Sequence, residues 1–375
     1  MIKVLSVIGT RPEAIKMAPV IQELRRNSSD AISVVCSTGQ HREMLHQVFS
    51  IFDLKPDIEL DVMRPDQSLA GLTSALLTEL DRVVHEEKPD WILAQGDTTS
   101  VMVASLLAFY HGVSFAHVEA GLRTGQLKHP FPEEANRRIA DLLATIYFAP
   151  TAHAKNNLLG EGAPEHSIVL SGNTVVDALQ EIATHPYLTS SELGQLLPGR
   201  RLVLITLHRR ESFGEPLAQL CQAIKDLSFA FPDTDFVYPV HLNPNVQSTV
   251  RQILSGLGNV ILLNPVDYPS MVHLLRNAYL VLTDSGGIQE EAPSFGVPIL
   301  VLRNTTERPE GVEAGIAKLV GTNKDRVVEE ATLILSSSLA RQNMSNGPNP
   351  YGDGKASKRI VDTLLGRKVD GVVEQ

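Results

Sequence analysis

Short apolar runs alternate with helical segments along almost the whole chain of 375 residues. This alternation restricts the fold more than any other feature, because strand, helix and strand in succession build a parallel sheet with right-handed crossovers. The runs form two series, one at 3–8, 33–38, 91–95, 114–118, 147–150 and 168–172, the other at 202–207, 235–240, 259–264, 279–284, 297–302 and 317–320. We therefore predict an α/β protein with two Rossmann-like domains, whose parallel sheets face each other across a cleft.

The regular alternation loosens near Gly172. The segment 181–200 that follows contains Pro186, Pro198 and scattered Ser and Gly residues. A chain of 375 residues is also too long for one ordinary core and suits two domains. We expect an N-terminal domain at 1–172 and a C-terminal domain at 173–355, with a last helix at about 356–375 that packs back on the first domain.

Composition narrows the class of partner. The net charge of −10 argues against nucleic acid or an anionic membrane as the main partner, although it leaves room for a phosphorylated small molecule. The two cysteines, Cys36 and Cys221, lie in apolar patterns typical of buried thiols. The first apolar run is too short for a signal peptide, and the helix at 101–110 is too short to span a bilayer. These features predict a cytoplasmic protein.

Three acidic residues in the stretch 91–140 stand at strand ends or at a helix start. Asp97 comes just after the run 91–95, Glu119 just after the run 114–118, and Glu133 begins a helix. Each alone could be a helix cap, since a helix N-terminus favours negative charge. Because strand C-termini line the ligand crevice of an open α/β sheet, the three together, with His117 beside them, favour a functional site.

The first strand-to-helix turn carries two cations, Arg11 and Lys16. Gly9 does not belong to a GxGxxG fingerprint, so this turn does not indicate a dinucleotide. The two side chains would extend over the crevice of the first domain. The alternative is a solvated pair on an ordinary helix.

The second domain carries its own polar turns. His208 follows the first strand of this series, where it suits proton transfer or hydrogen bonding to a phosphate; a half-buried structural histidine is an equal alternative. Ser285, Gly286 and Gly287 open a helix, and glycines there let backbone N–H groups approach an anion. Glu291 is placed to accept hydrogen bonds from a ribose.

A loop near the end of the second series adds charged residues. Arg303, Arg308 and Glu310 lie in a segment with Pro and Asn residues, where a cation could hold a pyrophosphate; a loop salt bridge is the alternative. Acids in one domain and a phosphate-binding turn in the other predict a nucleoside-diphosphate ligand whose reacting part points at the carboxylates.

Motifs along nearly the whole chain resemble those of one family. They are GTRPEAIKMAPV at 9–20, GQHREML at 39–45, QGDTTS at 95–100, HVEAGLRT at 117–124, FPEEANRR at 131–138, TLHRRES at 206–212, PVHLNPNV at 239–246, TDSGGIQEEA at 283–292 and RNTTERPEG at 303–311. The sequence resembles the non-hydrolysing UDP-N-acetylglucosamine 2-epimerases, which have the two-domain glycosyltransferase-B architecture.

The resemblance implies roles for particular residues. The catalytic residues implied are Asp97, Glu119, Glu133 and His208, and the substrate-binding residues are Arg11, Lys16, Ser285, Gly286, Gly287, Glu291 and Arg308. Some members bind a second UDP-GlcNAc beside residues like Gln40, His41 and His241. Asp66 stands where an Arg is expected at that allosteric site, and Val266 and Met271 replace a Gln and an aromatic residue near the uracil.

The resemblance also implies a reaction. Elimination of UDP across C1–C2 gives 2-acetamidoglucal, and UDP adds back after protonation on the opposite face, so that UDP-GlcNAc and UDP-ManNAc interconvert. This reaction needs no NAD, no metal and no other cofactor, and it would supply precursors of cell-surface polysaccharide. The alternatives are an epimerase of a UDP-2,3-diacetamido uronic acid, a glycosyltransferase with a UDP-sugar donor, or a sugar-nucleotide sensor. We expect a homodimer that binds neither nucleic acid nor membrane.

Overall fold

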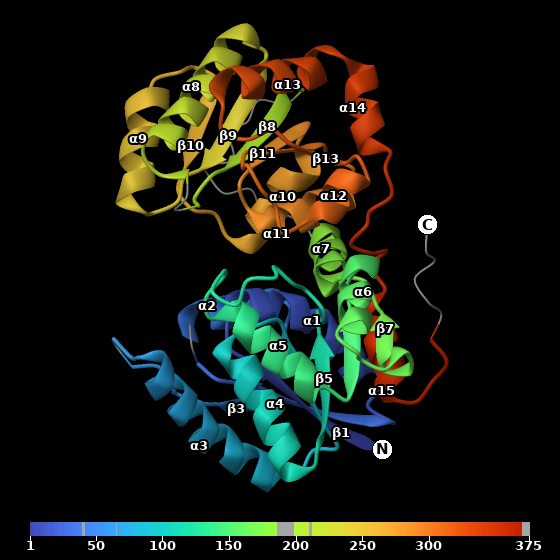
Figure 1. The fold of residues 1–375 in the computed structure, drawn as a ribbon. Helices are drawn as coiled ribbons and strands as arrows, with labels where there is room; N and C mark the ends of the chain where they lie inside the picture. The colour runs from blue at the N-terminus through green and yellow to red at the C-terminus, as the bar shows by residue number, and fades with distance from the viewer. Residues whose placement is uncertain (40–41, 65, 186–198, 210–211, 370–375) are drawn as a thin grey trace. The chain divides into compact units, whose positions relative to one another are not determined.

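The structure is a computed structural model that describes residues 1–375 except 40–41, 65, 186–198, 210–211 and 370–375. The chain separates into two compact units, Met1–Ala178 with Tyr351–Gln375, and Leu179–Pro350. Each unit is an α/β fold built on one parallel sheet, and each is described by itself (Figure 1). The expected α/β class with two parallel sheets is confirmed.

The first unit contains a seven-stranded parallel sheet. Its strands are β1 (Ile2–Ile8), β2 (Ala31–Ser37), β3 (Ile58–Glu59), β4 (Trp91–Gln95), β5 (Ser114–Val118), β6 (Ile146–Ala149) and β7 (Ile168–Leu170), in the order β3-β2-β1-β4-β5-β6-β7. The chain reverses its direction of travel across the sheet between β1 and β4. Right-handed crossovers then place helices on both faces, and a topological switch point opens at the carboxyl ends of these two strands.

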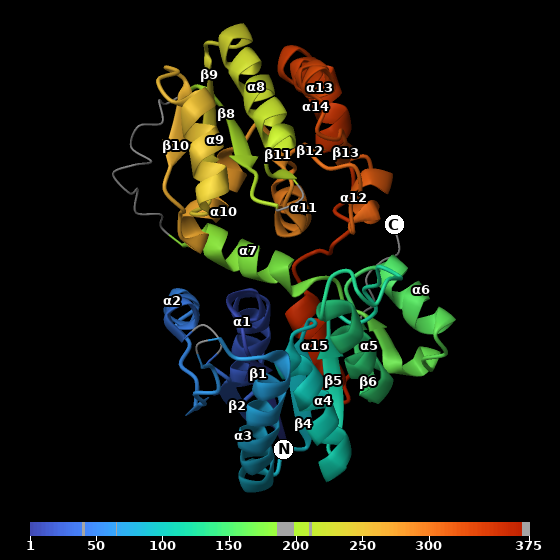
Figure 2. The ribbon, with the colours of Figure 1, turned by 60° about the vertical axis from the view of Figure 1, so that its left-hand side comes forward.

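Two layers of helices accompany this sheet (Figure 2). Helices α3 (Leu69–Glu87), α4 (Thr99–His111) and α5 (Glu133–Leu143) pack side by side in one layer; α2 (Arg42–Ile51), α1 (Arg11–Arg26) and α15 (Ala356–Leu364) do so in the other. Helix α6 (Ala152–Gly160) packs against β6 and β7. Helix α3 buries only some of its apolar residues. Leu76, Leu80 and Val83 are buried, but Leu69 is the first helical residue and is 43% exposed.

The second unit contains a six-stranded parallel sheet. Its strands are β8 (Arg201–Thr206), β9 (Thr234–Pro239), β10 (Val260–Leu263), β11 (Leu280–Thr283), β12 (Ile299–Val301) and β13 (Ala317–Leu319), in the order β10-β9-β8-β11-β12-β13. Its helices are α8 (Glu215–Ala230), α9 (Pro244–Leu254), α10 (Tyr268–Asn277), α11 (Gly286–Glu291), α12 (Pro309–Glu313), α13 (Lys324–Ser336) and α14 (Ser338–Ser345). The switch point of this sheet lies between β8 and β11.

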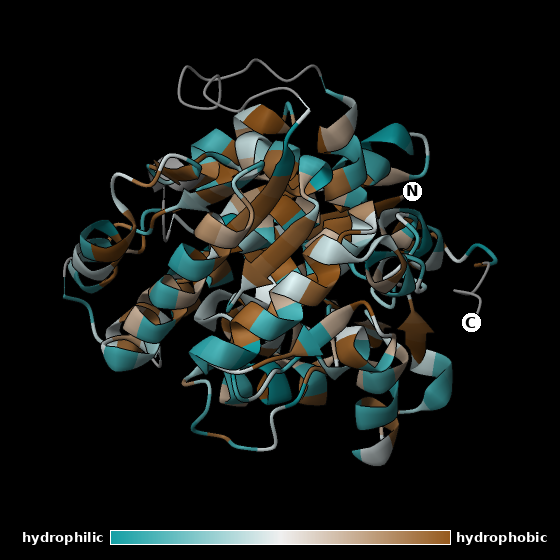
Figure 3. Cartoon of the chain, turned by 90° about the horizontal axis from the view of Figure 1, so that it is seen from above, coloured by the Kyte–Doolittle hydropathy of each residue, from teal (hydrophilic) through white to brown (hydrophobic). Residues whose placement is uncertain are grey.

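Strand β8 shows why this sheet is buried on both faces. Val203 and Ile205 belong to one apolar cluster, whereas Leu202 and Leu204 belong to a second cluster on the opposite face. Successive side chains of a strand point to opposite faces, so a continuous apolar run is what a sheet covered by two helical layers requires. The strands are accordingly coloured as hydrophobic in Figure 3, while the helices alternate between the two colours.

The unit boundaries fall within α7 (Thr174–Thr184) and before Tyr351. From the sequence we expected these boundaries between residues 172 and 173 and between residues 355 and 356. Within the first unit, α15 packs against α1, and the Asp177 carboxylate accepts from the backbone N–H groups of Ala356 and Ser357 at 3.2 and 2.8 Å. These contacts join the last helix to the N-terminal unit.

Cys36 and Cys221 are both buried free thiols, as predicted. Burial raises the pKa of each thiol to about 12, so both are protonated at neutral pH. Among the described residues, no helix combines the length and the apolar character that crossing a membrane requires.

Candidate functional site

Polar side chains converge at the switch point of the first unit. Strands β1, β4 and β5 are neighbours, and the turns that follow them carry Glu13, Asp97 and Glu119. The helix α5 begins at Glu133 and packs against α4 and β5. The fold therefore brings the three acids predicted from the sequence into one unit, two of them at one edge of its sheet and the third at the start of α5.

Glu119 is held by three neighbouring side chains. Its Oε1 forms an ion pair with Nζ of Lys16 at 2.6 Å and lies 3.4 Å from Nδ2 of Asn173, and its Oε2 accepts from Gln95. The backbone of Glu119 is left-handed, with a φ of 66°, a conformation that residues other than glycine rarely adopt. The contacts with these three side chains hold the buried Glu119 in this unfavourable backbone conformation. Backbone strain held in this way is typical of functional sites.

Asp97 is held by α5. Its side chain forms an ion pair with Arg137, and its backbone carbonyl accepts from Nδ2 of Asn136 at 3.0 Å. Arg137 also contacts the buried Glu134, with Nη1 to Oε2 at 3.2 Å. Helix α5 thus positions Asp97 through two adjacent residues and contributes Glu133 at its own N-terminus.

Three buried polar atoms in this region have no hydrogen-bond partner among the described residues: Oε2 of Glu133, Oε1 of Gln95 and Nε of Arg137. Such atoms are rare in native proteins and require an explanation. Gln95 contacts Glu119 and Arg137 contacts Asp97, so the three atoms belong to the acids or their immediate neighbours. A polar ligand at this edge of the sheet would provide the missing partners.

Arg11 and Lys16, the two cations predicted at the first turn, differ in exposure and in pairing. Arg11 is the first residue of α1 and is exposed. Lys16 instead has a side chain only 14% exposed and is paired with Glu119, so it acts on a site carboxylate directly. The sequence placed Lys16 over the crevice but could not identify this partner, which lies 103 residues away.

His117 does not line the site. It is fully buried, with Nδ1 2.6 Å from Oδ1 of Asp141 and Nε2 2.7 Å from the carbonyl oxygen of Gly96. Both ring nitrogens are therefore occupied by protein groups. Strand β5 ends at Val118 and the backbone of Glu119 is left-handed, so the rule that residues two apart in a strand share a face does not extend from His117 to Glu119.

Glu13 is a site residue that the sequence reasoning missed. Its Oε2 accepts from the N–H groups of Gly9 and Thr10 at 2.5 and 2.6 Å, and its Oε1 accepts from the Thr98 hydroxyl at 2.5 Å. Glu13 thereby joins the turn after β1 to the turn that carries Asp97. The signal was present, because Thr10 and Glu13 form a capping box, which is readable as T-x-x-E before a helix.

We expect Glu13→Gln to make the protein more stable at neutral pH. Burial raises the pKa of Glu13 to about 7, although its hydrogen bonds oppose this shift. A carboxyl with a raised folded-state pKa binds its proton more tightly in the folded protein, so stability falls as pH rises from about 4.5 to about 7. The glutamine can keep all three hydrogen bonds and removes up to about 3 kcal/mol of this pH dependence.

Urea unfolding of wild type and Glu13→Gln at pH 5 and pH 8 measures this difference. The partly buried Glu23, on the same helix, gives the control Glu23→Gln, whose pH dependence should match wild type. A free energy of unfolding that falls equally with pH in Glu13→Gln and wild type would contradict the expectation.

His208 and Asp284 meet at the switch point of the second unit. Asp284 is fully buried, and its carboxylate accepts from the backbone N–H of His208 at 2.9 Å and of Arg209 at 2.9 Å. Nδ1 of His208 lies 3.4 Å from Oδ1 of Asp284, and its ring stacks on His241 with centroids 5.8 Å apart. Burial, with help from Arg209 and His241, lowers the pKa of His208 despite Asp284. The lowered pKa favours the neutral imidazole.

The turn after β11 provides the glycines that the sequence predicted. Ser285 is the N-cap of α11 and its side chain makes no capping bond; its backbone N–H donates to Oγ1 of Thr283 at 2.9 Å. A Cβ added to Gly286 would lie 3.6 Å from Nη2 of Arg209. Glu291 is the last residue of α11, and its Oε1 lies 4.0 Å from the Cβ position of Gly287.

Arg209 is a second residue that the sequence reasoning missed. Its guanidinium lies beside Gly286, and its Nε is buried with no hydrogen-bond partner in the described part of the chain. A buried guanidinium donor next to a glycine turn suits an anionic ligand. The motif TLHRRES contained the residue, but nothing in its spacing distinguishes Arg209 from a solvated arginine.

The loop cations are paired in different ways. Arg303 binds Glu307 with two contacts of 2.8 and 3.2 Å, which is the loop salt bridge named as the alternative. Burial acts to raise the pKa of Glu307, but Arg303 outweighs it and holds the pKa at about 2. Arg308 forms an ion pair with the buried Glu290. This contact fixes the Arg308 side chain relative to α11.

The proposed allosteric residues are only partly described. Gln40 and His41 lie outside the described residues, while His241 stacks on His208. Asp66 is exposed and has a left-handed backbone with a φ of 54°. Val266 and Met271 are partly buried and pack against an apolar cluster of the second unit. Among the described residues, no group of three or more His, Cys, Asp and Glu could hold a metal ion.

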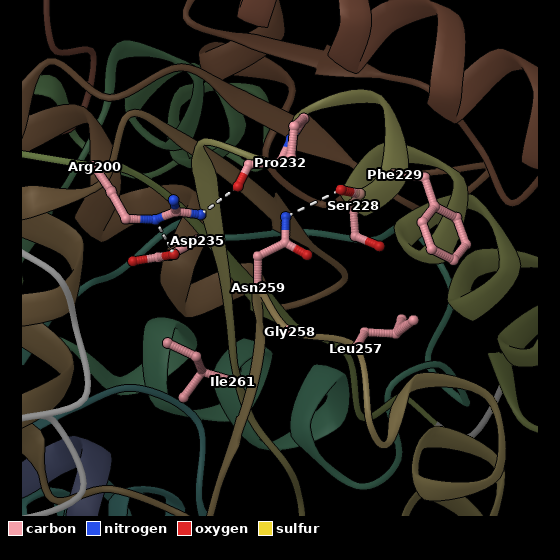
Figure 4. Close-up of a pocket in the computed structure, with 9 residues that line it drawn as sticks. All are labelled: Arg200, Ser228, Phe229, Pro232, Asp235, Leu257, Gly258, Asn259 and Ile261. Atoms are coloured by element: carbon pink, nitrogen blue, oxygen red, sulfur yellow. Dashed lines mark hydrogen bonds and ion pairs between the residues drawn. The ribbon is translucent and has the colours of Figure 1, made fainter.

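A separate pocket of about 450 Å³ lies near the amino ends of β8, β9 and β10 (Figure 4). Arg200 in its wall donates to Asp235 at 2.6 Å and to the carbonyl of Pro232 at 2.6 Å. Nδ2 of Asn259 is likewise used by the carbonyls of Ser228, Phe231 and Thr234. These polar groups are engaged with the protein, and the pocket lies at the opposite strand ends from the site residues.

The chain forms two α/β units, each built on a parallel sheet. One unit carries the carboxylates and the other carries a histidine and a glycine turn. These features define an enzyme of the glycosyltransferase-B fold class. In agreement, the described fold is similar to a crystal structure titled as the glycotransferase of kitacinnamycin, with a TM-score of 0.66 at 14% identity over 96% of this chain and 98% of that chain. At this identity the likeness concerns the fold alone.

Closer comparisons define the family. Residues 22–365 match the family described as UDP-N-acetylglucosamine 2-epimerase. The UDP-N-acetylglucosamine 2-epimerase of Yersinia pestis is 49% identical over 98% of this chain and 99% of that protein. The Neisseria meningitidis UDP-GlcNAc 2-epimerase, solved bound to UDP-GlcNAc, has a TM-score of 0.89 at 46% identity, covering 97% and 100% of the two chains. The chain belongs to the UDP-N-acetylglucosamine 2-epimerase family, and as an epimerase it is an isomerase.

Proposed function

We propose that this enzyme interconverts UDP-N-acetylglucosamine and UDP-N-acetylmannosamine by inverting C2 of the sugar. The observation that carries the proposal is that Asp97 and Glu119 follow the neighbouring strands β4 and β5, and that Glu133 begins the helix α5 that holds Asp97, in a chain that belongs to this family. Inversion at a carbon that bears hydrogen requires removal and return of a proton, and carboxylates are suitable acids and bases for both steps.

The chemistry we propose is elimination followed by addition. A carboxylate takes the proton from C2, the C2–H electrons form the C1–C2 double bond, and the C1–O electrons leave with UDP. The products of this half are 2-acetamidoglucal and UDP. Protonation of C2 on the opposite face and attack of a UDP phosphate oxygen on C1 complete the reaction. The proton at C2 is not acidic, so loss of UDP in the same half-reaction avoids a free carbanion.

The three acids differ in the contacts that their carboxylates make. Glu119 is paired with Lys16, and Asp97 is paired with Arg137. Glu133 keeps a buried oxygen without a hydrogen-bond partner among the described residues. We therefore propose that Glu133 carries a proton in the reaction, and that Asp97 and Glu119 supply the second proton transfer and orient the sugar.

The second unit would bind the UDP moiety. We propose that Ser285, Gly286 and Gly287 offer backbone N–H groups to the diphosphate and that Glu291 accepts from the ribose. Arg308 and Arg209 would neutralise the phosphates while UDP is a free leaving group. Burial lowers the pKa of His208 and so favours the neutral imidazole, whose single N–H would donate to a phosphate oxygen.

Incubation with UDP-N-acetylglucosamine alone tests the function, with the sugar resonances followed by NMR. An epimerase converts the sugar without any acceptor, whereas a glycosyltransferase leaves it unchanged. An epimerase that acts on a UDP-2,3-diacetamido uronic acid would likewise leave UDP-N-acetylglucosamine unchanged. Supply of cell-surface polysaccharide precursors, a cytoplasmic location and a homodimer stay predictions.

We expect Arg308→Ala to weaken UDP binding by roughly 1–3 kcal/mol, as for the loss of one hydrogen bond to a charged group. Glu291→Ala should have a similar effect. Isothermal titration of UDP into each variant measures it. The exposed Arg251 on α9 provides the control Arg251→Ala, for which the affinity should not change. Unchanged UDP affinity in both site variants would contradict the proposed diphosphate site.

A further inference from the structure

Asp141 lies on α5 and contacts two other segments of the carboxylate site. Its Oδ1 is 2.6 Å from Nδ1 of His117 on β5, and its Oδ2 accepts from the backbone N–H of Gly121 at 3.2 Å. Oδ2 also forms an ion pair with Nη2 of Arg123 at 2.7 Å. Asp141 is only 4% exposed. One buried carboxylate therefore joins the helix that begins at Glu133 to the turn after β5.

His117 extends this connection to the neighbouring strand. Its Nε2 lies 2.7 Å from the carbonyl oxygen of Gly96, the residue before Asp97. The two ring nitrogens thus face two oxygen acceptors, a carboxylate and a carbonyl. A neutral imidazole has a single N–H and would direct a lone pair at one of these oxygens. Only the imidazolium donates to both, so beside an ionised Asp141 the geometry favours a charged His117.

The electrostatics of the pair agree with this geometry. Burial acts to lower the pKa of His117, but the Asp141 carboxylate outweighs it and the pKa is raised. The pKa of Asp141 is lowered although burial opposes this, because His117 and Arg123 stabilise the carboxylate. A buried ion pair of this kind is favoured only when its remaining polar groups are also hydrogen-bonded. Gly96, Gly121 and Arg123 meet that condition.

Each of the three segments that this network joins carries one of the three acids. Asp97 follows Gly96, Glu119 is two residues before Gly121, and Glu133 begins the helix that carries Asp141. We propose that the His117 imidazolium and the Asp141 carboxylate form a positioning pair that holds the segments bearing these three acids in one arrangement. The proposal rests on the proposed function, because that function assigns the acids to the reaction. His117 itself does not contact the substrate.

Other charged groups surround the pair. Asp97 faces it from the turn after β4 and Tyr147 from β6, while Arg123 links Asp141 to the half-exposed Glu161 with Nη2 2.6 Å from Oε2. Because the folded-state pKa of His117 is raised, the pair is intact below the ordinary histidine pKa and is lost as pH rises through the raised value. Turnover should therefore fall on the alkaline side.

NMR of wild-type enzyme labelled with nitrogen-15 in histidine tests the charge state without any substitution. At pH 8.5 an ordinary histidine, with a pKa of about 6.5, is about 99% neutral. We expect one histidine to keep protons on both nitrogens at this pH, with slow exchange of both. That signal should persist in His111→Gln, which removes a His–Asp pair at the far end of α4. A spectrum without a doubly protonated histidine would overturn the proposal.

Kinetics test the positioning role. We expect Asp141→Asn and His117→Gln to lower kcat at least about tenfold, because a shift of about 1 Å in catalytic groups can cost about a hundredfold. The Kd of UDP should stay within about twofold of wild type, since neither residue is assigned to the UDP site. In Asp141→Asn the alkaline limb should move to lower pH, because His117 loses its counterion. In His117→Gln this limb should disappear, and His111→Gln should keep wild-type kinetics.

The outcomes separate the two proposals. Wild-type enzyme that fails to epimerise contradicts the proposed function, whereas the NMR result does not depend on turnover and still tests the pair. Folded Asp141→Asn and His117→Gln with wild-type kcat and an unchanged alkaline limb would overturn the positioning role. If both variants fail to fold, the wild-type NMR spectrum decides whether the imidazolium exists.

Discussion

Turnover of the Glu133→Gln variant should fall by at least about a hundredfold, the scale on which a general acid or base contributes to catalysis. Glutamine matches the size of glutamate but cannot take or return a proton. Glu133 has a buried oxygen without a hydrogen-bond partner among the described residues, so no protein cation there is disturbed by the change. The loss should therefore appear in kcat, while the Kd of UDP stays near that of wild type. Initial rates and UDP titration measure the two quantities.

Two further amide variants complete this test. Asp97→Asn and Glu119→Gln should also lose at least about a hundredfold in turnover. They additionally weaken the ion pairs with Arg137 and Lys16, so their thermal unfolding must be measured beside their rates. Glu165→Gln, at an exposed position of the same unit, is the matched control and should keep the wild-type rate. Near-normal rates in all three site variants would show that the active site is misplaced.

In D₂O, both UDP-N-acetylglucosamine and UDP-N-acetylmannosamine should acquire deuterium at C2 during the reaction. The proton leaves C2 for a carboxyl group that exchanges with solvent, and the group that reprotonates the opposite face carries deuterium. Elimination has the same consequence in either direction, so the label should reach essentially every turned-over molecule. Proton NMR at C2 measures the loss of signal, and Glu133→Gln should slow it in parallel with turnover.

The fate of the C1–O bond distinguishes elimination from a redox route. Oxygen-18 placed in the sugar–phosphate bridge should scramble into non-bridging positions, because UDP becomes free and its phosphate can rotate. Long incubations should also release small amounts of UDP and 2-acetamidoglucal. A route through a ketone would keep the C1–O bond intact. Epimerisation with neither C2 deuterium nor glucal would refute the role proposed for the three acids.

The order of apolar runs along the chain by itself determines the architecture. Buried parallel strands must be apolar on both faces, and the runs at 202–207 and 279–284 correspond closely to β8 and β11. The right-handed crossover then leaves few topologies for such an alternation. The sequence did not predict β3, because two residues, Ile58 and Glu59, form no recognisable pattern. Periodicity likewise does not show that Leu69, the first residue of α3, is exposed, because it does not show where the partner surface ends.

Position after a strand was enough to select Asp97 and Glu119 as site candidates, because the carboxyl ends of neighbouring parallel strands share one edge. Only the tertiary structure decided what each acid contacts. Lys16 pairs with Glu119, Arg137 pairs with Asp97, and Glu133 alone keeps a buried oxygen without a partner among the described residues. Such contacts depend on strand order and helix packing, which bring together side chains about 40 to 100 positions apart. For the same reason His117, two residues from Glu119, is occupied by Asp141 and Gly96 and lies within the protein core.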